Sequence, residues 1–143
     1  MKLLFLDIDG VLTSNETKSR KEFLYTFSAS CVGALNRILR ENKVKIILTS
    51  SWRTVFDAEK QNQIFSENGV IQLPSGQTND FGYEKRHLEI QDYLSKRKVE
   101  NYVILDDMKI NGFDEHFVLV NPATGLTEND VEKVNRILGN LFK

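Results

Sequence analysis

Short runs of apolar residues alternate along this chain with longer stretches in which apolar residues recur every three or four positions. The short runs have the length of β-strands that are buried on both faces. They cover residues 3–6, 44–48, 70–73, 102–105 and 117–120. Strands that alternate with helices in this way are typical of a mostly parallel sheet covered by helices. The pattern therefore predicts an α/β fold, a three-layer sandwich.

Apolar stripes at helical spacing predict the helices between these strands. One helix should follow residue 28, a second should run from Ser51 to near Gly69, and a third should begin at Lys85 and Arg86. A closing helix should begin at Thr127, which with Asp130 approximates a capping box. The stripes consist of Val32, Leu35, Ile38 and Leu39; Val55, Phe56, Ile64 and Phe65; Leu88, Ile90, Tyr93 and Leu94; and Val131, Val134, Ile137, Leu138 and Leu141.

Two segments between these elements read as loops. Residues 13–27 are polar and mixed, and 74–82 are rich in turn formers. The basic residues Lys18, Arg20 and Lys21 of the first segment fit either a solvated face or a rim that meets a phosphorylated polymer. Neither loop is large enough for a separate cap domain, so we expect an open site.

Composition narrows the class of protein. The 143 residues carry 19 basic and 20 acidic side chains, so we expect one domain over 1–143 with no overall attraction to nucleic acid. Cys31, the single cysteine, lies in a helical apolar pattern and is expected to be a buried structural thiol. Acid follows too soon after the N-terminus for a signal peptide, and no apolar run approaches a membrane span. A cytoplasmic protein is the expectation.

Polar side chains follow three of the predicted strands at the point where each strand ends. Asp7, Asp9 and Gly10 follow the first, residues 49–53 (Thr-Ser-Ser-Trp-Arg) follow the second, and 106–107 (Asp-Asp) follow the fourth. Parallel strands place ligand sites outside their carboxyl ends, so these three ends can converge on one crevice. The plainer alternative is a set of acidic turns.

Four carboxylates at one crevice need a cation. Two like charges about 4 Å apart repel by roughly 4 kcal/mol at an effective dielectric near 20. Ligation by oxygen atoms alone selects a hard ion, and Mg²⁺ can bridge to phosphate while it keeps waters. The expected metal ligands are Asp7, Asp9, Asp106 and Asp107, and which of the last two touches the ion directly stays open.

These motifs resemble the haloacid dehalogenase (HAD) superfamily of phosphohydrolases, and more narrowly the small HAD domains of multi-part RNA repair proteins. The resemblance spans essentially the whole chain and implies a Rossmann-like sheet with the Asp7 strand at its centre. It rests on Phe5-Leu6-Asp7-Ile8-Asp9-Gly10-Val11-Leu12, Thr49-Ser50-Ser51-Trp52-Arg53, Arg86 to Glu89-Ile90, Leu105-Asp106-Asp107 and Gly125-Leu126-Thr127.

The resemblance also implies roles for the first two carboxylates. Asp7 would be the nucleophile that forms an aspartyl-phosphate, which divides one displacement into two easier steps. Asp9 would protonate the leaving oxygen and later deprotonate the attacking water, and its backbone carbonyl would bind the metal. The overall reaction would be the hydrolysis of a phosphomonoester.

Donors for the phosphoryl oxygens come from the later motifs. Ser50 is the preferred hydroxyl because Thr49 can still belong to the strand, and Ser51 is its close rival. Arg53 would contact phosphate or a nucleic-acid backbone. Lys85 and Arg86 compete for the superfamily's basic position, and the narrower family's Arg-x-x-Glu-Ile pattern favours Arg86. Trp52 either packs or stacks on a base, and packing is favoured.

The function predicted from sequence is that of a Mg²⁺-dependent phosphatase without a cap domain. The RNA-repair resemblance implies polynucleotide ends, such as 3′-phosphates, as substrate. Two alternatives stay open: a phosphatase of nucleotides or small metabolites, and a module that binds phosphate or a partner protein without hydrolysis. The retention of Asp7, Asp9 and Asp106 together argues against the second alternative, because a binding module needs no nucleophile beside an acid.

Overall fold

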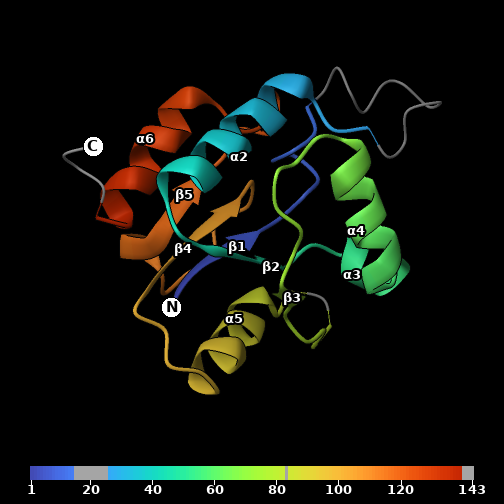
Figure 1. Cartoon of the computed structure of the whole chain (residues 1–143). Helices are drawn as coiled ribbons and strands as arrows, with labels where there is room; N and C mark the ends of the chain where they lie inside the picture. The colour runs from blue at the N-terminus through green and yellow to red at the C-terminus, as the bar shows by residue number, and fades with distance from the viewer. Residues whose placement is uncertain (15–25, 83, 140–143) are drawn as a thin grey trace.

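The computed structural model describes residues 1–14, 26–82 and 84–139. A central sheet separates helices on its two faces, which confirms the predicted three-layer α/β sandwich (Figure 1). In chain order the elements are β1 (Lys2–Leu6), α2 (Ala29–Glu41), β2 (Lys45–Leu48), α3 (Trp52–Val55), α4 (Ala58–Glu67), β3 (Gly76–Gln77), α5 (Arg86–Ser95), β4 (Asn101–Asp106), the 3₁₀ helix η2 (Asp114–His116), β5 (Phe117–Leu119) and α6 (Glu128–Ile137).

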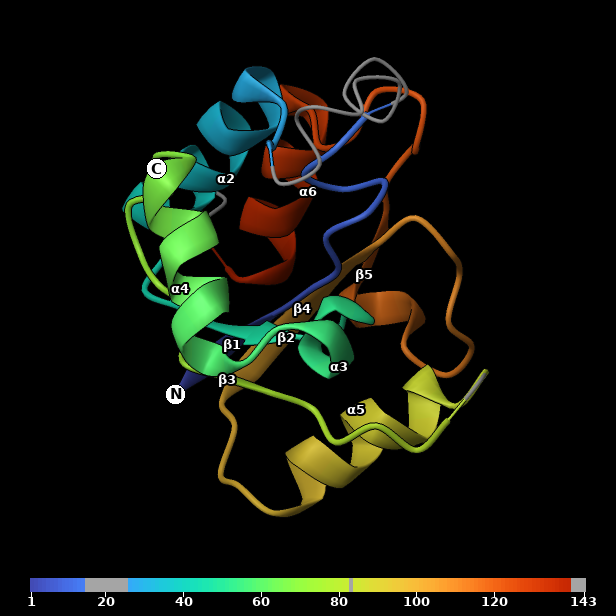
Figure 2. The ribbon, with the colours of Figure 1, turned by 90° about the vertical axis from the view of Figure 1, so that its right-hand side faces the viewer.

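The sheet has five parallel strands in the order β3-β2-β1-β4-β5, so β1 is central as expected. Alternate residues of β1 point to opposite faces. Leu4 and Leu6 join the larger core beneath α2, α4 and α6, whereas Leu3 and Phe5 join the smaller core beneath α5. Figure 2 shows α5 on the side of the sheet opposite α2, α4 and α6. Because both faces of β1 are buried from its second residue onward, the strand is continuously apolar from Leu3 to Leu6.

Most predicted elements are found where the pattern placed them. The stripe of α2 is buried, and Thr127 and Asp130 form the capping box of α6. Cys31 is fully buried and its Sγ lies 3.5 Å from the carbonyl oxygen of Thr124, which fits the expected structural thiol. None of the helices in the described ranges is long and apolar enough to cross a membrane.

Three predictions about the segment after β2 are wrong. The strand expected over 70–73 is absent, and β3 forms instead at Gly76–Gln77, inside the segment predicted to be a loop. The single helix expected between Ser51 and Gly69 is divided into α3, which ends at Val55, and α4, which Asp57 caps by accepting a hydrogen bond from the Lys60 amide. Val55, predicted to be core, is 70% exposed.

Parts of two other predictions lie outside the described residues. They are the loop with its basic residues Lys18, Arg20 and Lys21, and the end of the closing helix with Leu141. The described residues contain no large cap domain over the carboxyl ends of the strands, as expected for a chain of this size.

Candidate active site

The carboxyl ends of β1 and β4 create the candidate site. From β1 the chain crosses to β2 and β3 on one side, and then returns to β4 on the other side of β1. Open α/β sheets bind ligands where the strand order reverses in this way. Asp7 follows β1, and its amide still donates to the Leu105 carbonyl, 3.1 Å away. Asp106 is the last residue of β4. The two acids therefore flank the reversal point.

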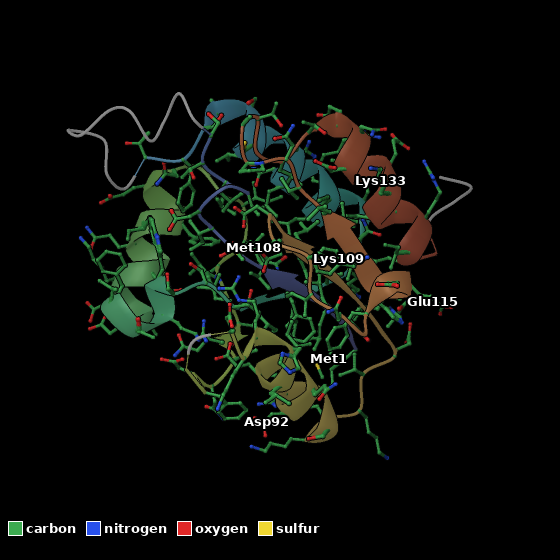
Figure 3. All side chains as sticks on the ribbon, turned by 180° about the vertical axis from the view of Figure 1, so that it is seen from behind. Met1, Asp92, Met108, Lys109, Glu115 and Lys133 are labelled. Atoms are coloured by element: carbon green, nitrogen blue, oxygen red, sulfur yellow. The ribbon has the colours of Figure 1, made fainter. Side chains whose placement is uncertain are left out.

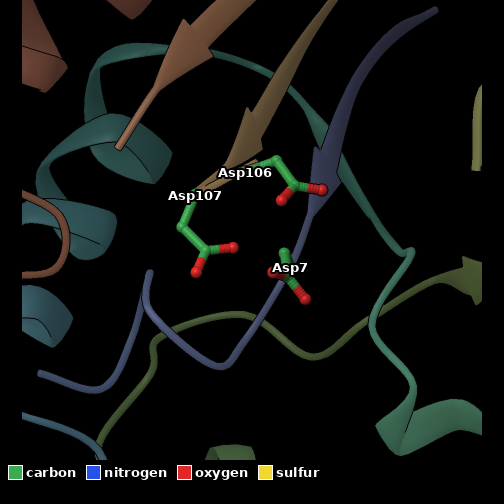
Figure 4. A group of neighbouring side chains, drawn as sticks. All are labelled: Asp7, Asp106 and Asp107. Atoms are coloured by element: carbon green, nitrogen blue, oxygen red, sulfur yellow. The ribbon is translucent and has the colours of Figure 1, made fainter. Parts of the chain in front are cut away.

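Three carboxylates meet at this point, as Figure 4 shows. Asp7, Asp106 and Asp107 each offer an oxygen, and these oxygens all lie within 4.8 Å of one another. Gly10 makes this approach feasible, because a Cβ at this position would lie 2.8 Å from Cγ of Asp107. Gly10 also has a φ of +82°, which other residues rarely adopt. Asp107 can therefore take its place beside the other two acids because residue 10 is a glycine.

Arg86 is the cation that faces these acids. Its Nη1 lies 2.6 Å from Oδ2 of Asp106 and 3.6 Å from Oδ2 of Asp7. Lys85, its rival in the sequence, is exposed at the start of α5, and no hydrogen bond or ion pair of its side chain with a described residue is found. The structure therefore brings Arg86, and not Lys85, to the carboxylates.

Burial, more than the balance of charge, favours the neutral forms of Asp7 and Asp106. Burial, together with the negative charge of Asp106, raises the pKa of Asp7 to about 8, although Arg86 opposes the shift. Burial also raises the pKa of Asp106, against the opposing effect of Arg86. The pKa of Arg86 is raised as well: burial acts to lower it, but Asp106 and Asp7 outweigh that effect. One guanidinium does not compensate three acids.

Asp9 lies apart from the three grouped carboxylates. Its side chain is exposed, and its Oδ2 accepts a hydrogen bond from Nε1 of Trp52 over 3.2 Å. Any part of Asp9 in metal binding would therefore fall to its backbone carbonyl, as the family resemblance implies. Trp52 packs against Phe27 and Phe56, in line with the favoured prediction. Its hydrogen bond to Asp9 was not anticipated.

The three hydroxyl residues after β2 differ in position. Thr49 is fully buried and extends the strand, with its amide donating to the Leu6 carbonyl. Ser50 is also buried, and its Oγ accepts from the Trp52 amide over 3.1 Å. Ser51 is exposed and lines a cavity beside the acids. Thr49 is thus part of the core, while Ser50 and Ser51 remain the candidates for phosphate.

Arg53, predicted to contact phosphate, is occupied by protein groups. Its Nη2 lies 2.7 Å from Oε1 of Glu89, and its Nη1 donates to the carbonyls of Thr49 and Ser50. The other oxygen of Glu89 accepts from the Phe81 amide over 2.8 Å. Both side chains are almost fully buried, at 5% and 2% exposure. These contacts favour an architectural role for Arg53.

Glu89 was missed as a functional residue. It joins the segment after β2, the loop before α5 and α5 itself, and it is one helical turn from Arg86. Residues three apart lie on one side of a helix, so Glu89 fixes the helix that presents Arg86. The Arg-x-x-Glu spacing was the available signal.

A cavity of about 750 Å³ opens beside Arg86 and Asp106. Ser51, Lys85, Met108 and Lys109 are among its lining residues. Met108 is 69% exposed. Figure 3 shows Met108 and Lys109 between α5, which carries Asp92, and α6, which carries Lys133. A volume of this size is typical of a site for a small organic ligand.

The acid group suits a hard divalent cation. Its donors are all oxygen atoms from buried or half-buried carboxylates. Mg²⁺ binds oxygen ligands at about 2.0–2.1 Å in octahedral geometry, so two of its ligands lie no more than about 4.2 Å apart. Oxygens that all lie within 4.8 Å of one another need only small adjustments to reach that geometry. The residues therefore fit the metal expected from the sequence.

Comparison with known protein families identifies the class of this chain. The family described as "HAD domain in Swiss Army Knife RNA repair proteins" matches residues 3–131. The chain belongs to this family, and its parallel sheet is the Rossmann-like α/β fold of HAD proteins. Searches of curated proteins and of solved structures gave no match.

Proposed function

We propose that this chain is a Mg²⁺-dependent phosphomonoesterase that acts through an aspartyl-phosphate at Asp7. The observation that carries the proposal is the meeting of three carboxylates and Arg86 at the reversal point of the sheet, beside a large cavity. Membership of the HAD family supports a phosphohydrolase role. Mg²⁺ would be held by Asp7, Asp106 and Asp107 and would make the phosphorus more electrophilic while screening it from the carboxylates.

In the first step, an oxygen of ionised Asp7 attacks the phosphorus. The bond between phosphorus and the leaving oxygen breaks, its electron pair stays with that oxygen, and Asp9 supplies the proton. Arg86 would meet the phosphoryl oxygens in place of its present partner Asp106. Ser50 and Ser51 are the candidates for further hydrogen bonds to the same group.

In the second step, Asp9 accepts a proton from water, and the water oxygen attacks the phosphorus of the aspartyl-phosphate. The bond between phosphorus and the Asp7 oxygen breaks, which releases inorganic phosphate and restores the carboxylate. Asp9 can serve both steps because it gives up its proton in the first and regains one in the second.

The substrate that we propose is a polynucleotide end, such as a 3′-phosphate. The cavity beside Arg86 gives the leaving group room, and Lys85 and Lys109 line it as cations for a neighbouring backbone phosphate. The exposed side chain of Met108 offers an apolar surface for a base. The family description, which places such domains in RNA repair proteins, supports the same substrate class.

The test is Mg²⁺-dependent phosphate release from a 3′-phosphorylated RNA oligonucleotide, by the wild type and by Asp7→Asn. Asp107→Asn is a matched variant, because it removes one charge from the same cluster but leaves the proposed nucleophile. We expect release by the wild type, none by Asp7→Asn, and a raised Mg²⁺ requirement for Asp107→Asn.

A free nucleotide and an aryl phosphate should be assayed beside the oligonucleotide. Preference for the free nucleotide would replace the polymer by a small-molecule substrate. Hydrolysis of the aryl phosphate alone would retain the phosphatase but not the RNA end. No hydrolysis of any of the three would favour a module that binds without catalysis.

A further inference from the structure

Trp52 holds the side chain of Asp9 by its indole nitrogen. The Nε1–H donates to Oδ2 over 3.2 Å, and this is the one hydrogen bond found between the Asp9 side chain and the described residues. Oδ1 is left to exchange a proton with substrate. An exposed aspartate samples several rotamers, and each anchored atom reduces that freedom. The contact therefore restricts where the free oxygen lies.

The indole is itself fixed by the larger core. Its ring lies 5.3 Å from the ring of Phe56, at an interplanar angle of 71°, and 5.9 Å from the ring of Phe27. Phe27 is buried and meets Phe65 edge-on at 5.5 Å. Aromatic pairs in such geometries stabilise each other's orientation. The hydrogen-bond donor is thus part of a rigid aromatic cluster.

We propose that Trp52 is a positioning residue for proton transfer by Asp9. The inference rests on the phosphatase function proposed above. Trp52 does not touch the reacting atoms. It sets the orientation in which Oδ1 of Asp9 gives its proton to the leaving oxygen as the bond between phosphorus and that oxygen breaks. A proton donor must lie within hydrogen-bond reach of its acceptor, so a freely rotating Asp9 would be productive less often.

The leaving group provides the test. A nitrophenolate leaves as a stable anion, whereas a ribose or alkyl oxygen needs the proton. Trp52→Phe keeps the ring and removes the donor. We expect kcat/KM for an alkyl phosphate to fall about tenfold, a fraction of the full contribution of general acid catalysis, and kcat/KM for 4-nitrophenyl phosphate to fall about twofold.

Two further variants separate positioning from general damage. Phe56→Leu keeps the indole nitrogen but loosens the packing that fixes the ring, so it should change the ratio of the two substrates in the same direction as Trp52→Phe, by a smaller factor. In an Asp9→Asn background, Trp52→Phe should cause little further loss, because the two residues act through one proton transfer. Equal losses for both substrates, or additive losses in the double variant, would overturn the proposal.

The hydrogen bond can also be observed without activity. Trp52 is the single tryptophan of the sequence, so its indole N–H gives one identifiable resonance. Asp9→Asn should shift this resonance, and Asp92→Asn, on α5, should not. If the wild type is active but Asp9→Asn does not shift the resonance, the proposed role of Trp52 is wrong and the proposed function is unaffected. A shift without hydrolysis of any phosphomonoester would overturn the proposed function, and the catalytic role of the contact with it.

Discussion

Helix α5 contributes one residue to each of two buried groups of charge, and these groups are built differently. Glu89 lies 2.7 Å from Arg53, the half-exposed Asp80 lies farther away at 3.8 Å, and backbone groups satisfy most of the remaining hydrogen-bonding atoms of the pair. One turn earlier, Arg86 faces Asp7, Asp106 and Asp107. In the first group the protein supplies an opposite charge for Arg53, whereas the second has an excess of negative charge.

This difference separates a structural ion pair from a site that needs a ligand. A balanced buried pair holds segments together but leaves nothing for a substrate. An excess of carboxylates lowers the stability of the metal-free protein and becomes favourable when a cation arrives. Helix α5 thus connects the structural ion pair with the candidate active site, because the pair that contains Glu89 fixes the helix that presents Arg86.

The largest expected effect on stability is at the balanced pair. Glu89→Gln should lower the free energy of unfolding by about 3–5 kcal/mol, because it leaves Arg53 charged and buried without its partner. Urea denaturation measures this change. Glu132→Gln is the matched control, since Glu132 is a half-exposed partner of Arg37 at 2.8 Å and should cost about 1 kcal/mol or less. Equal costs would contradict the architectural role of Glu89.

Removing a charge from the acids around Arg86 should have the opposite effect and stabilise the metal-free protein. Asp7 binds a proton more tightly when folded, since its pKa rises from 3.8 to about 8. The stability of the metal-free wild type should therefore fall as the pH rises through this window, and level off above it. Asp7→Asn should be more stable than the wild type above about pH 8, by on the order of 2 kcal/mol or more. Thermal or urea unfolding against pH, with EDTA present, gives the measurement. If Asp7→Asn is less stable than the wild type above about pH 8, the site does not carry a destabilising excess of negative charge.

The third expected effect is stabilisation of the protein by Mg²⁺. At a concentration about 100 times its dissociation constant it should stabilise the wild type by about 2.7 kcal/mol. The stabilisation should be weaker at about pH 6 than at about pH 8.5, because the ion must displace the proton of Asp7. Melting temperatures with and without Mg²⁺ measure it. Asp106→Asn should respond less than the wild type. A pH-independent response, or an equal one in this variant, would argue against binding at these acids.

The buried strands and the acids behind them could be predicted from the sequence, because a strand buried on both faces has a continuous apolar run. The strand β3 could not. It is a two-residue edge strand of Gly76 and Gln77, which have no apolar pattern. The division between α3 and α4 had a signal in Asp57, whose capping role competes with the helical periodicity on either side.

Three of the four acids expected at the metal site come together, but their partners could not be predicted. Which of Lys85 and Arg86 faces the carboxylates depends on how α5 is oriented, and Glu89 and Arg53 determine that orientation through contacts distant in sequence. Arg53 was assigned to phosphate because Ser51-Trp52-Arg53 resembles the Ser-x-Arg arrangement of polynucleotide phosphatases in the superfamily. A pattern of residue types does not reveal that a buried glutamate 36 positions away already occupies it.

The aspartyl-phosphate proposed at Asp7 is tested most directly by locating the phosphoryl group on the protein during turnover. The enzyme is mixed with substrate and Mg²⁺, quenched in acid and digested, and the peptides are analysed by mass spectrometry. If Asp7 is the nucleophile, one added phosphoryl group should be found on Asp7, and none should be found on Asp7→Asn. A phosphoryl group on Ser50 or Ser51, or turnover with no modified peptide under conditions that preserve acyl phosphates, would contradict it.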